Sequence, residues 1–173
     1  MVKYIYNSDL FSPEYEEYML CHQVNCQGRM GSGVALQVKN KYPNVFSEYH
    51  FLCNRFNNGE YGTCSRTSLL GFCLTCNTNR KTPIANLFAQ DTYGYDGKQY
   101  TDEAAFQDAF IRACENVRAY MAINGNIKGI VLPYKIGCCR GGADWNIISK
   151  IIEDIANEHN VDVLIVSNQP EGM

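Results

Sequence analysis

Short apolar runs alternate with amphipathic stretches along most of the chain. Runs rich in β-branched and aromatic residues predict strands at Val2–Tyr6, Tyr18–Val24, Thr67–Leu74, Pro83–Phe88, Ile130–Leu132 and Val161–Val166. Apolar residues at helical spacing predict helices at Val34–Lys41, from Pro43 onward, after Thr101 and after Asp144. This alternation favours an α/β fold in three layers, α/β/α, with a mixed sheet of about six strands between helices.

The expected helix ends follow from polar residues ahead of the apolar spacing. Thr101 is the predicted N-cap of the long third helix, and Asp144 is the predicted N-cap of the last one. Phe106 and Phe110 lie four residues apart on one face of the third helix. We interpret these aromatic residues as a core stripe and not as part of a cofactor site.

Composition and charge narrow the class of protein. With 173 residues, 46% hydrophobic and 19% charged, the chain has the composition of one globular domain spanning residues 1–173. The net charge of −3 gives no electrostatic footprint for duplex nucleic acid. Because neither a signal peptide nor an apolar run of membrane-spanning length is visible, we expect a cytoplasmic protein with no membrane partner.

The nine cysteines are odd in number and irregularly spaced. We therefore expect reduced thiols that behave mostly as small buried hydrophobes. Cys73 and Cys76 form one C-x-x-C, but a structural zinc site needs a second pair of ligands, which the sequence does not offer. No motif implies a metal ion or a cofactor.

Two glycine-rich stretches carry the candidate chemistry. Each is a strand that runs through a glycine-rich turn into a helix, at residues 18–35 and 130–145. Such a turn presents free backbone N–H groups to a phosphate, and the helix dipole favours the negative charge. Neither stretch has the spacing of G-x-G-x-x-G or of a P-loop, so plain turn chemistry is the alternative for either one alone. Together they suggest a ligand with two phosphates.

Five segments in order resemble the macro domain family. They are Ser8-Asp9-Leu10-Phe11, the run from Val24-Asn25-Cys26 to Gly33-Val34-Ala35, Asn86-Leu87-Phe88, Ile136-Gly137-Cys138 and Asp144-Trp145. The resemblance is closest to the compact branch that includes ADP-ribose-1''-phosphate phosphatases, ADP-ribosyl hydrolases and related phage proteins. It implies a three-layer macro domain whose small-molecule partner is ADP-ribose or a derivative.

The resemblance also implies roles for particular residues. Asp9 would accept a hydrogen bond from the adenine amino group, with Leu10 beside it, and Asn25 would orient the distal ribose. The first phosphate loop would be Gly31, Ser32, Gly33 and Val34. The second loop would be Gly137, Cys138, Cys139, Arg140, Gly141 and Gly142. Tyr93 or Tyr95 would cover the adenine or the distal ribose.

The chemistry implied by the resemblance is divided. The lysine-dependent ADP-ribosyl hydrolases have a lysine after the central strand, where this chain has Ala89 or Gln90. They also have an aspartate in the second loop, where this chain has Gly141. The phosphatase branch has a histidine before its asparagine, and His22 stands there.

A half-protonated His22 would act as general acid or nucleophile, and Asp91 would be the acidic partner that orients His22 or a water. The alternatives are a hydrogen-bonded histidine in a buried strand and a solvated loop aspartate. Three functions stay open at this point: hydrolysis of ADP-ribose-1''-phosphate, non-catalytic capture of ADP-ribose, and removal of ADP-ribose or acyl groups from a modified macromolecule.

Overall fold

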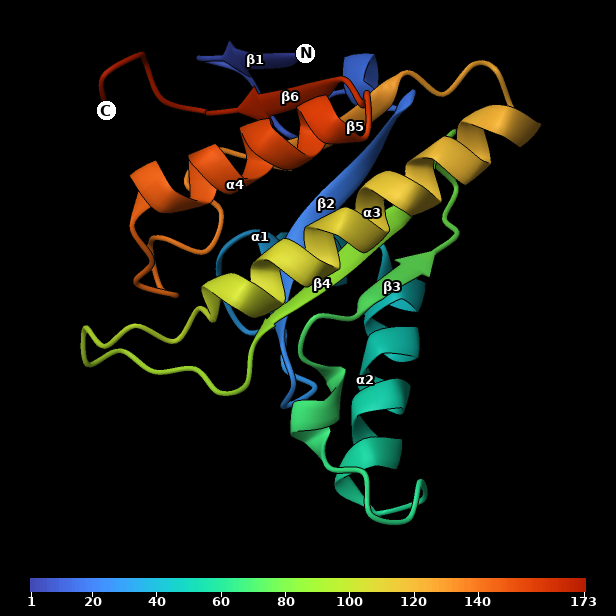
Figure 1. Ribbon diagram of the computed structural model, residues 1–173, viewed down its shortest axis with the longest axis vertical. Coiled ribbons are helices and arrows are strands. Elements are labelled where there is room, and N and C mark those ends of the chain that lie inside the picture. The colour runs from blue at the N-terminus through green and yellow to red at the C-terminus, as the bar shows by residue number, and fades with distance from the viewer.

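The computed structural model describes residues 1–173 and contains one six-stranded mixed sheet (Figure 1). In the sheet the strands follow the order β1-β6-β5-β2-β4-β3. The strands are β1 (Val2–Ile5), β2 (Tyr18–Asn25), β3 (Cys73–Cys76), β4 (Ile84–Gln90), β5 (Gly129–Pro133) and β6 (Val163–Val166). Only β3 runs antiparallel to its neighbour, and the other strands are parallel. The predicted mixed sheet is confirmed.

Helices cover both faces of this sheet, as the sequence predicts. They are α1 (Gly33–Lys41), α2 (Pro43–Asn57), α3 (Glu103–Ile123) and α4 (Trp145–Glu158), with 3-10 turns at Pro13–Tyr15 and Arg66–Leu69. Helices α3 and α4 pack on one face, and α1 and α2 lie on the other (Figure 1). No helix has the length and apolar character needed to cross a membrane.

Strand β2 forms the centre of the core because both of its faces are covered. Met19 and Cys21 pack with the side chains of α3 and α4. Leu20 and Val24 pack on the opposite face with residues of α1 and α2. The apolar run that predicts this strand is therefore the signature of a central strand buried on both sides.

Two local predictions are wrong. The segment Thr67–Leu74 is not one strand: a 3-10 turn at Arg66–Leu69 comes first, and β3 begins only at Cys73. Gly71, with a φ of +83°, turns the chain between them, so the buried Leu69 reflects packing and not strand structure.

The N-cap of α3 is Asp102 and not Thr101, because the Asp102 carboxylate accepts a hydrogen bond from the Ala105 amide. Asp144 caps α4 as predicted.

The two cysteines of the C-x-x-C lie on opposite faces of the sheet. Cys73 packs among the side chains of the α3 face, and Cys76 packs among those of the α2 face. Residues three apart in a strand point to opposite faces, so the two thiols cannot share a ligand. Burial raises the pKa of Cys73 to about 11 and that of Cys76 to about 12. Both side chains therefore act as buried hydrophobic groups.

The topology determines where a ligand site can form. Strands β2, β4 and β5 are parallel neighbours, so their carboxyl ends meet at one edge of the sheet. The loops that follow them lead into α1, α3 and α4. In open α/β sheets, ligands bind in the crevice at this edge.

Candidate functional site

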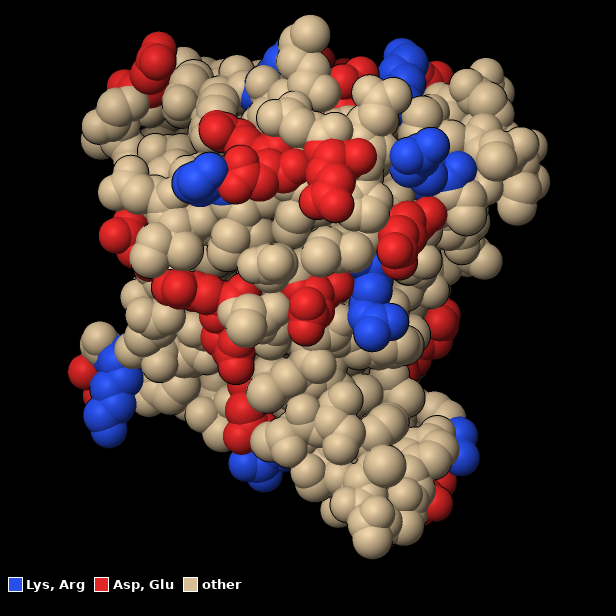
Figure 2. Space-filling view, in the orientation of Figure 1, with Lys and Arg blue, Asp and Glu red and all other residues tan.

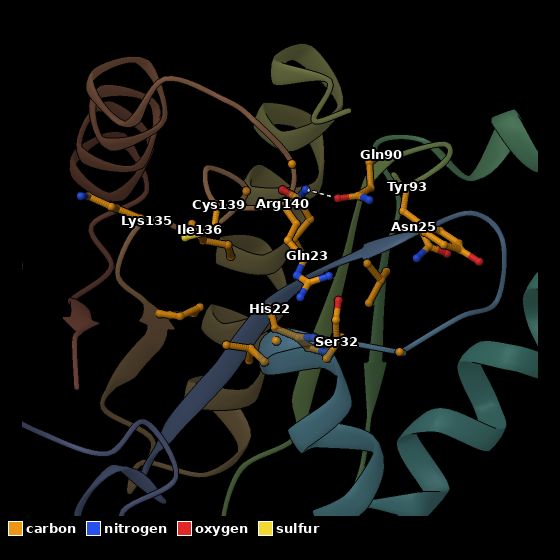
Figure 3. A pocket seen from close by; sticks show the side chains of 18 of the residues that line it. His22, Gln23, Asn25, Ser32, Gln90, Tyr93, Lys135, Ile136, Cys139 and Arg140 are labelled. Carbon is orange, nitrogen blue, oxygen red and sulfur yellow. Dashed lines mark hydrogen bonds between the residues drawn. The ribbon is translucent and has the colours of Figure 1, made fainter. Parts of the chain in front are cut away.

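A cavity of about 450 Å³ opens at the carboxyl ends of β2, β4 and β5 (Figure 3). Its walls come from the end of β2, the two glycine-rich loops and the loop after β4. The lining residues of β2 and the first loop are His22, Gln23, Val24, Asn25, Arg29, Gly31, Ser32, Gly33, Val34 and Ala35. Those of the later segments are Gln90, Tyr93, Gly94, Tyr95, Pro133, Tyr134, Lys135, Ile136, Gly137, Cys139, Arg140 and Gly141. The structure thus brings together the two stretches that the sequence singles out.

The first glycine-rich loop presents the beginning of α1 to the cavity. Ser32 is the N-cap residue but makes no side-chain capping bond, and the first backbone bond into α1 runs from Leu36 N to Ser32 O. The amides of Gly33, Val34 and Ala35 therefore precede the hydrogen-bonded turns of the helix. A Cβ on Gly31 would meet no atom within 4 Å, so a ligand has room to approach the backbone there. This is the geometry of an anion site at a helix N-terminus.

The second glycine-rich loop packs closely against the residues that precede α3. Gly141 O accepts hydrogen bonds from Tyr100 N at 2.8 Å and from Thr101 N at 2.9 Å. Gly137, Cys139, Arg140 and Gly141 line the cavity, whereas Cys138 and Gly142 do not. Cys138 is half-buried, and burial raises the pKa of its thiol to about 11. Of the six residues predicted for this loop, four therefore face the cavity.

The side chain of Asn25 stabilises the first loop through hydrogen bonds to its backbone. Its Oδ1 accepts from Gln27 N at 2.9 Å and from Tyr49 Oη at 2.8 Å, while its Nδ2 donates to Arg29 O at 2.8 Å. The side chain is buried and lines the cavity. Together with a longer bond from Arg29 N to Oδ1 at 3.4 Å, these hydrogen bonds fix its orientation, so a ligand meets an amide whose position is set in advance.

His22 is buried and neutral, which corrects the expected half-protonated side chain. Only 1% of its surface is exposed, and burial lowers the pKa of its imidazole to about 4. Nε2 lies 2.7 Å from Asn86 Oδ1. Asn86 Nδ2 donates to Leu74 O, so its Oδ1 is the acceptor toward His22 and the proton sits on Nε2. His22 Nδ1 is buried at the cavity wall, has no hydrogen-bond partner in the protein and carries a free lone pair.

Asp91 does not pair with His22, and this expectation is wrong. Its carboxylate receives Arg66 Nε at 2.7 Å and Arg66 Nη2 at 3.3 Å. Asp91 is also absent from the cavity wall, because the chain leaves β4 after Gln90. The Asp91 carboxylate therefore has a structural partner in the turn ahead of β3.

Asp9 and Leu10 lie outside the cavity wall. Asp9 is exposed, and its Oδ1 accepts a bond from Phe11 N at 3.0 Å. Leu10 is buried in the core on the α1 and α2 face. The adenine contact that the family resemblance implies for Asp9 therefore stays a prediction.

Several lining residues were missed by the sequence reasoning, and Gln23 is the most informative. Its Nε2 donates to Gln90 Oε1 at 2.7 Å, the dashed line in Figure 3, and to Thr101 Oγ1 at 2.8 Å. A polar side chain inside an otherwise apolar strand is the signal that marks such a position. Arg29 and Tyr134 carried no comparable signal, because exposed residues of these types occur in most loops.

The charge of the cavity is opposite to that of the chain. Arg29, Lys135 and Arg140 are among the lining residues, and no aspartate or glutamate is, although the chain carries a net charge of −3. The Lys135 ammonium points away from the cavity, toward Met173 O at 3.4 Å, so the two arginines supply the positive charge (Figure 3). The exposed acidic residues of α3 and α4 lie on the outer helical face instead (Figure 2). Because the cavity walls concentrate the field of these cations, the arrangement favours an anionic ligand.

Comparisons with known proteins give relatives that act on ADP-ribose groups. No protein-family model matches the chain. It is 26% identical over 159 residues to the DNA ADP-ribosyl glycohydrolases of Mycobacterium tuberculosis and Mycobacterium bovis, covering 84% of this chain but 37% of the length of those relatives. It is 29% identical over 175 residues to an ADP-ribose 1''-phosphate phosphatase of Saccharomyces cerevisiae, covering 90% of this chain and 93% of that one.

Solved structures agree over almost the whole chain. The macrodomain of Mycobacterium tuberculosis DarG superposes with a TM-score of 0.70 at 21% identity, over 99% of this chain and 100% of that one. Thermosipho africanus DarTG in complex with ADP-ribose gives a TM-score of 0.72 at 17% identity, over 99% of this chain and 42% of that one. The chain has the macro domain fold. The order of the six strands and the helices on both faces belong to that fold.

Two residues of the cavity wall bear on the lysine-dependent hydrolysis that the resemblance implies for some relatives, namely Gln90 and Gly141. Of the two residues that the resemblance sets against the lysine, Gln90 lines the cavity at the end of β4 and Ala89 is in the core. Gly141 is the residue that the resemblance sets against the aspartate. A Cβ on Gly141 would lie 2.1 Å from Thr101 Oγ1 and 2.3 Å from Gly137 O, so an aspartate does not fit without moving the backbone.

Proposed function

We propose that this macro domain binds ADP-ribose or a derivative of it, with the diphosphate between the two glycine-rich loops. The observation that carries this proposal is a cavity whose lining includes Arg29 and Arg140 and no carboxylate in a chain of net negative charge. The N-terminal amides of α1 add uncharged donors suited to phosphate oxygens. The named activities of the relatives and the ADP-ribose complex of a structural neighbour support the same ligand.

Isothermal titration calorimetry with a graded series of ligands tests the proposal. ADP-ribose, AMP and adenosine share the adenine but carry two phosphates, one phosphate and none. Affinity should fall in that order, because the cations and helix amides recognise the phosphates. Equal affinity for adenosine and ADP-ribose, or no heat with ADP-ribose at millimolar concentration, would reject the proposal.

We further propose hydrolysis of ADP-ribose-1''-phosphate to ADP-ribose and inorganic phosphate. His22 favours this candidate, since a neutral imidazole with a free Nδ1 lone pair can accept a proton. Water attacks the phosphorus, its proton passes to Nδ1, and the bond between phosphorus and the 1''-oxygen breaks. The proton then passes to the departing oxygen. Arg29 and Arg140 offset the charge of the phosphate.

Removal of ADP-ribose from a macromolecule is less supported, because the resemblance sets Gln90 and Gly141 against the lysine and the aspartate of the lysine-dependent hydrolases.

Two variants of His22 separate the functions of its ring nitrogens. His22→Gln keeps a donor near Nε2 and loses the acceptor at Nδ1, whereas His22→Asn keeps a polar atom near Nδ1 and loses the bond to Asn86. Phosphate release from ADP-ribose-1''-phosphate should fall at least about 100-fold in His22→Gln while ADP-ribose binding stays within about threefold. Full phosphate release by His22→Gln would remove His22 from the mechanism. Binding without any release by the wild type would leave the non-catalytic module.

A further inference from the structure

Thr101 lies buried between the sheet and the second glycine-rich loop. Only 3% of its surface is exposed, and it lies just before Asp102, the N-cap of α3. Its Oγ1 is 2.7 Å from Gly137 O and 2.8 Å from Gln23 Nε2. Its backbone N donates to Gly141 O at 2.9 Å. One residue therefore contacts both ends of the segment Gly137–Gly141.

The direction of these hydrogen bonds is fixed by the chemistry of the groups. The Gln23 amide nitrogen has two hydrogens and donates them to Gln90 Oε1 and Thr101 Oγ1. The Thr101 hydroxyl hydrogen is then left for Gly137 O, a carbonyl that can only accept. The result is a directed chain from Gln23 through Thr101 to Gly137, in which each bond polarises the next.

The second loop is drawn so close to this chain that side chains are excluded at two positions. A Cβ on Gly137 would lie 2.6 Å from Gln23 Oε1 and 3.2 Å from Thr101 Oγ1. A Cβ on Gly141 would lie 2.1 Å from the same hydroxyl. Between these two anchored glycines, Cys139 and Arg140 line the cavity. The anchoring therefore determines where the ligand-facing part of the loop lies.

The Thr101 hydroxyl is not used by the helix beside it. Asp102 caps α3 through its own carboxylate, so Thr101 is not needed to begin that helix. The Thr101 hydroxyl makes both of its hydrogen bonds to groups at the cavity.

We propose that Thr101 is a positioning residue that holds the second glycine-rich loop in the conformation that binds the ligand. This inference rests on the proposed function, because it takes ADP-ribose as the ligand. Thr101 touches the loop and not the ligand, so its effect on binding is transmitted through Gly137 and Gly141. A loop held in place before binding loses less freedom when the ligand arrives, which raises affinity.

Two substitutions test the hydroxyl separately from the shape. Thr101→Val has the same shape without the hydroxyl, and Thr101→Ser keeps the hydroxyl and loses the methyl group. ADP-ribose affinity measured by calorimetry should fall about tenfold or more in Thr101→Val and stay within about threefold of wild type in Thr101→Ser. Ile152→Val, in the core far along α4, controls for general destabilisation and should bind as wild type does.

Hydrogen–deuterium exchange gives a second readout that does not depend on the ligand. Amides of residues 136–143 should exchange about tenfold faster in Thr101→Val than in wild type and Thr101→Ser. If the wild type binds ADP-ribose and Thr101→Val binds it equally well, the inference about Thr101 is overturned and the proposed function still stands. If the wild type does not bind ADP-ribose, the proposed function is rejected, and the exchange rates of residues 136–143 then decide whether Thr101 positions the second loop. Exchange unchanged by Thr101→Val overturns it in either case.

Discussion

At the scale of single residues, the buried end of β2 changes what a titratable side chain can do. His22 lies on the α1 side of the central strand and donates a hydrogen bond from Nε2 to Asn86 Oδ1. Burial lowers the pKa of its imidazole to about 4. It is therefore an uncharged acceptor at neutral pH. Next to it in sequence but on the opposite face, Gln23 begins the hydrogen-bond chain that reaches the second loop. Adjacent residues thus serve opposite walls of the cavity.

The lowered pKa of His22 predicts a loss of stability in acid. The ordinary histidine pKa of about 6.5 applies to the unfolded chain. Between pH 6.5 and pH 4 the unfolded state takes up a proton that the folded state does not, so the free energy of unfolding falls. The full difference amounts to about 3 kcal/mol. Urea unfolding of wild type and His22→Gln at pH 7 and pH 4.5 measures it. If the free energy of unfolding falls equally in wild type and His22→Gln when the pH is lowered from 7 to 4.5, a buried neutral His22 is contradicted.

Sequence reasoning identified the residue types at the site better than their partners. The family resemblance, and not a local pattern, singled out His22 and Asn25, and the structure places both of them in the cavity wall. Sequence reasoning paired His22 with Asp91, whereas the partners are Asn86 for His22 and Arg66 for Asp91. The pairing of β2 with β4 places His22 opposite Asn86, and that register depends on contacts distant in the sequence. No local pattern carries it.

At the scale of secondary-structure elements, each glycine-rich loop is determined by the strand before it and the helix after it. The sequence predicted both arrangements because each glycine cluster separates a strand pattern from a helical one. It did not predict the turn at Arg66–Leu69, where Leu69 is buried without belonging to a strand. Thr101 was expected to cap α3, and the structure gives that task to Asp102. Propensity alone does not distinguish two neighbouring residues that can both cap a helix.

A substitution at Gly137 tests the close packing of the second loop. Gly137 has a φ of +75°, and its Cβ would lie 2.6 Å from Gln23 Oε1. Gly137→Ala should weaken ADP-ribose binding at least about tenfold because the loop must move away from β2. Gly62→Ala is the matched control, since Gly62 has a φ of +68° with no atom within 4 Å of the added Cβ. Equal affinity in the two variants would show that the clash does not affect the site.

The cap of α4 can be tested independently of binding. Asp144 accepts a hydrogen bond from Asn146 N at 2.8 Å at the helix that follows the second loop. Asp144→Ala should lower the free energy of unfolding by about 1 kcal/mol, because it leaves a helix amide without its partner. Asp144→Asn retains a capping oxygen and should stay within about 0.5 kcal/mol of wild type. Chemical denaturation that ranks the two variants in the reverse order would reject this assignment.

At the scale of the whole molecule, charge is separated between the cavity and the outer surface. Fold class and the number of strands follow from the alternation of apolar runs, and the structure confirms both. Arg140 was expected in the second loop, but the approach of Arg29 to the same cavity could not be predicted, because Arg29 is far from Arg140 in sequence and meets it only through the sheet topology. The net charge of −3 gives no hint of it.

This separation of charge predicts that binding weakens with salt. Raising the salt concentration from about 0.05 M to 0.5 M shortens the Debye length and should lower ADP-ribose affinity about threefold or more. The Arg140→Gln variant should bind ADP-ribose more weakly than wild type, and its affinity should change less with salt concentration. Lys128→Gln removes the same charge beside Glu17 at the other end of the sheet and should behave as wild type. Salt-independent affinity in the wild type would contradict an electrostatic cavity.

The most direct test of the central claim is an amide-resolved NMR titration of the ¹⁵N-labelled protein with ADP-ribose. If the diphosphate lies between the two glycine-rich loops, the amides of residues 31–35 and 137–142 should show the largest chemical-shift changes and saturate together. Adenosine should leave the amides of residues 31–35 nearly unchanged, because it carries no phosphate. Saturable changes confined to other surfaces, or none at all at millimolar ADP-ribose, would contradict the account.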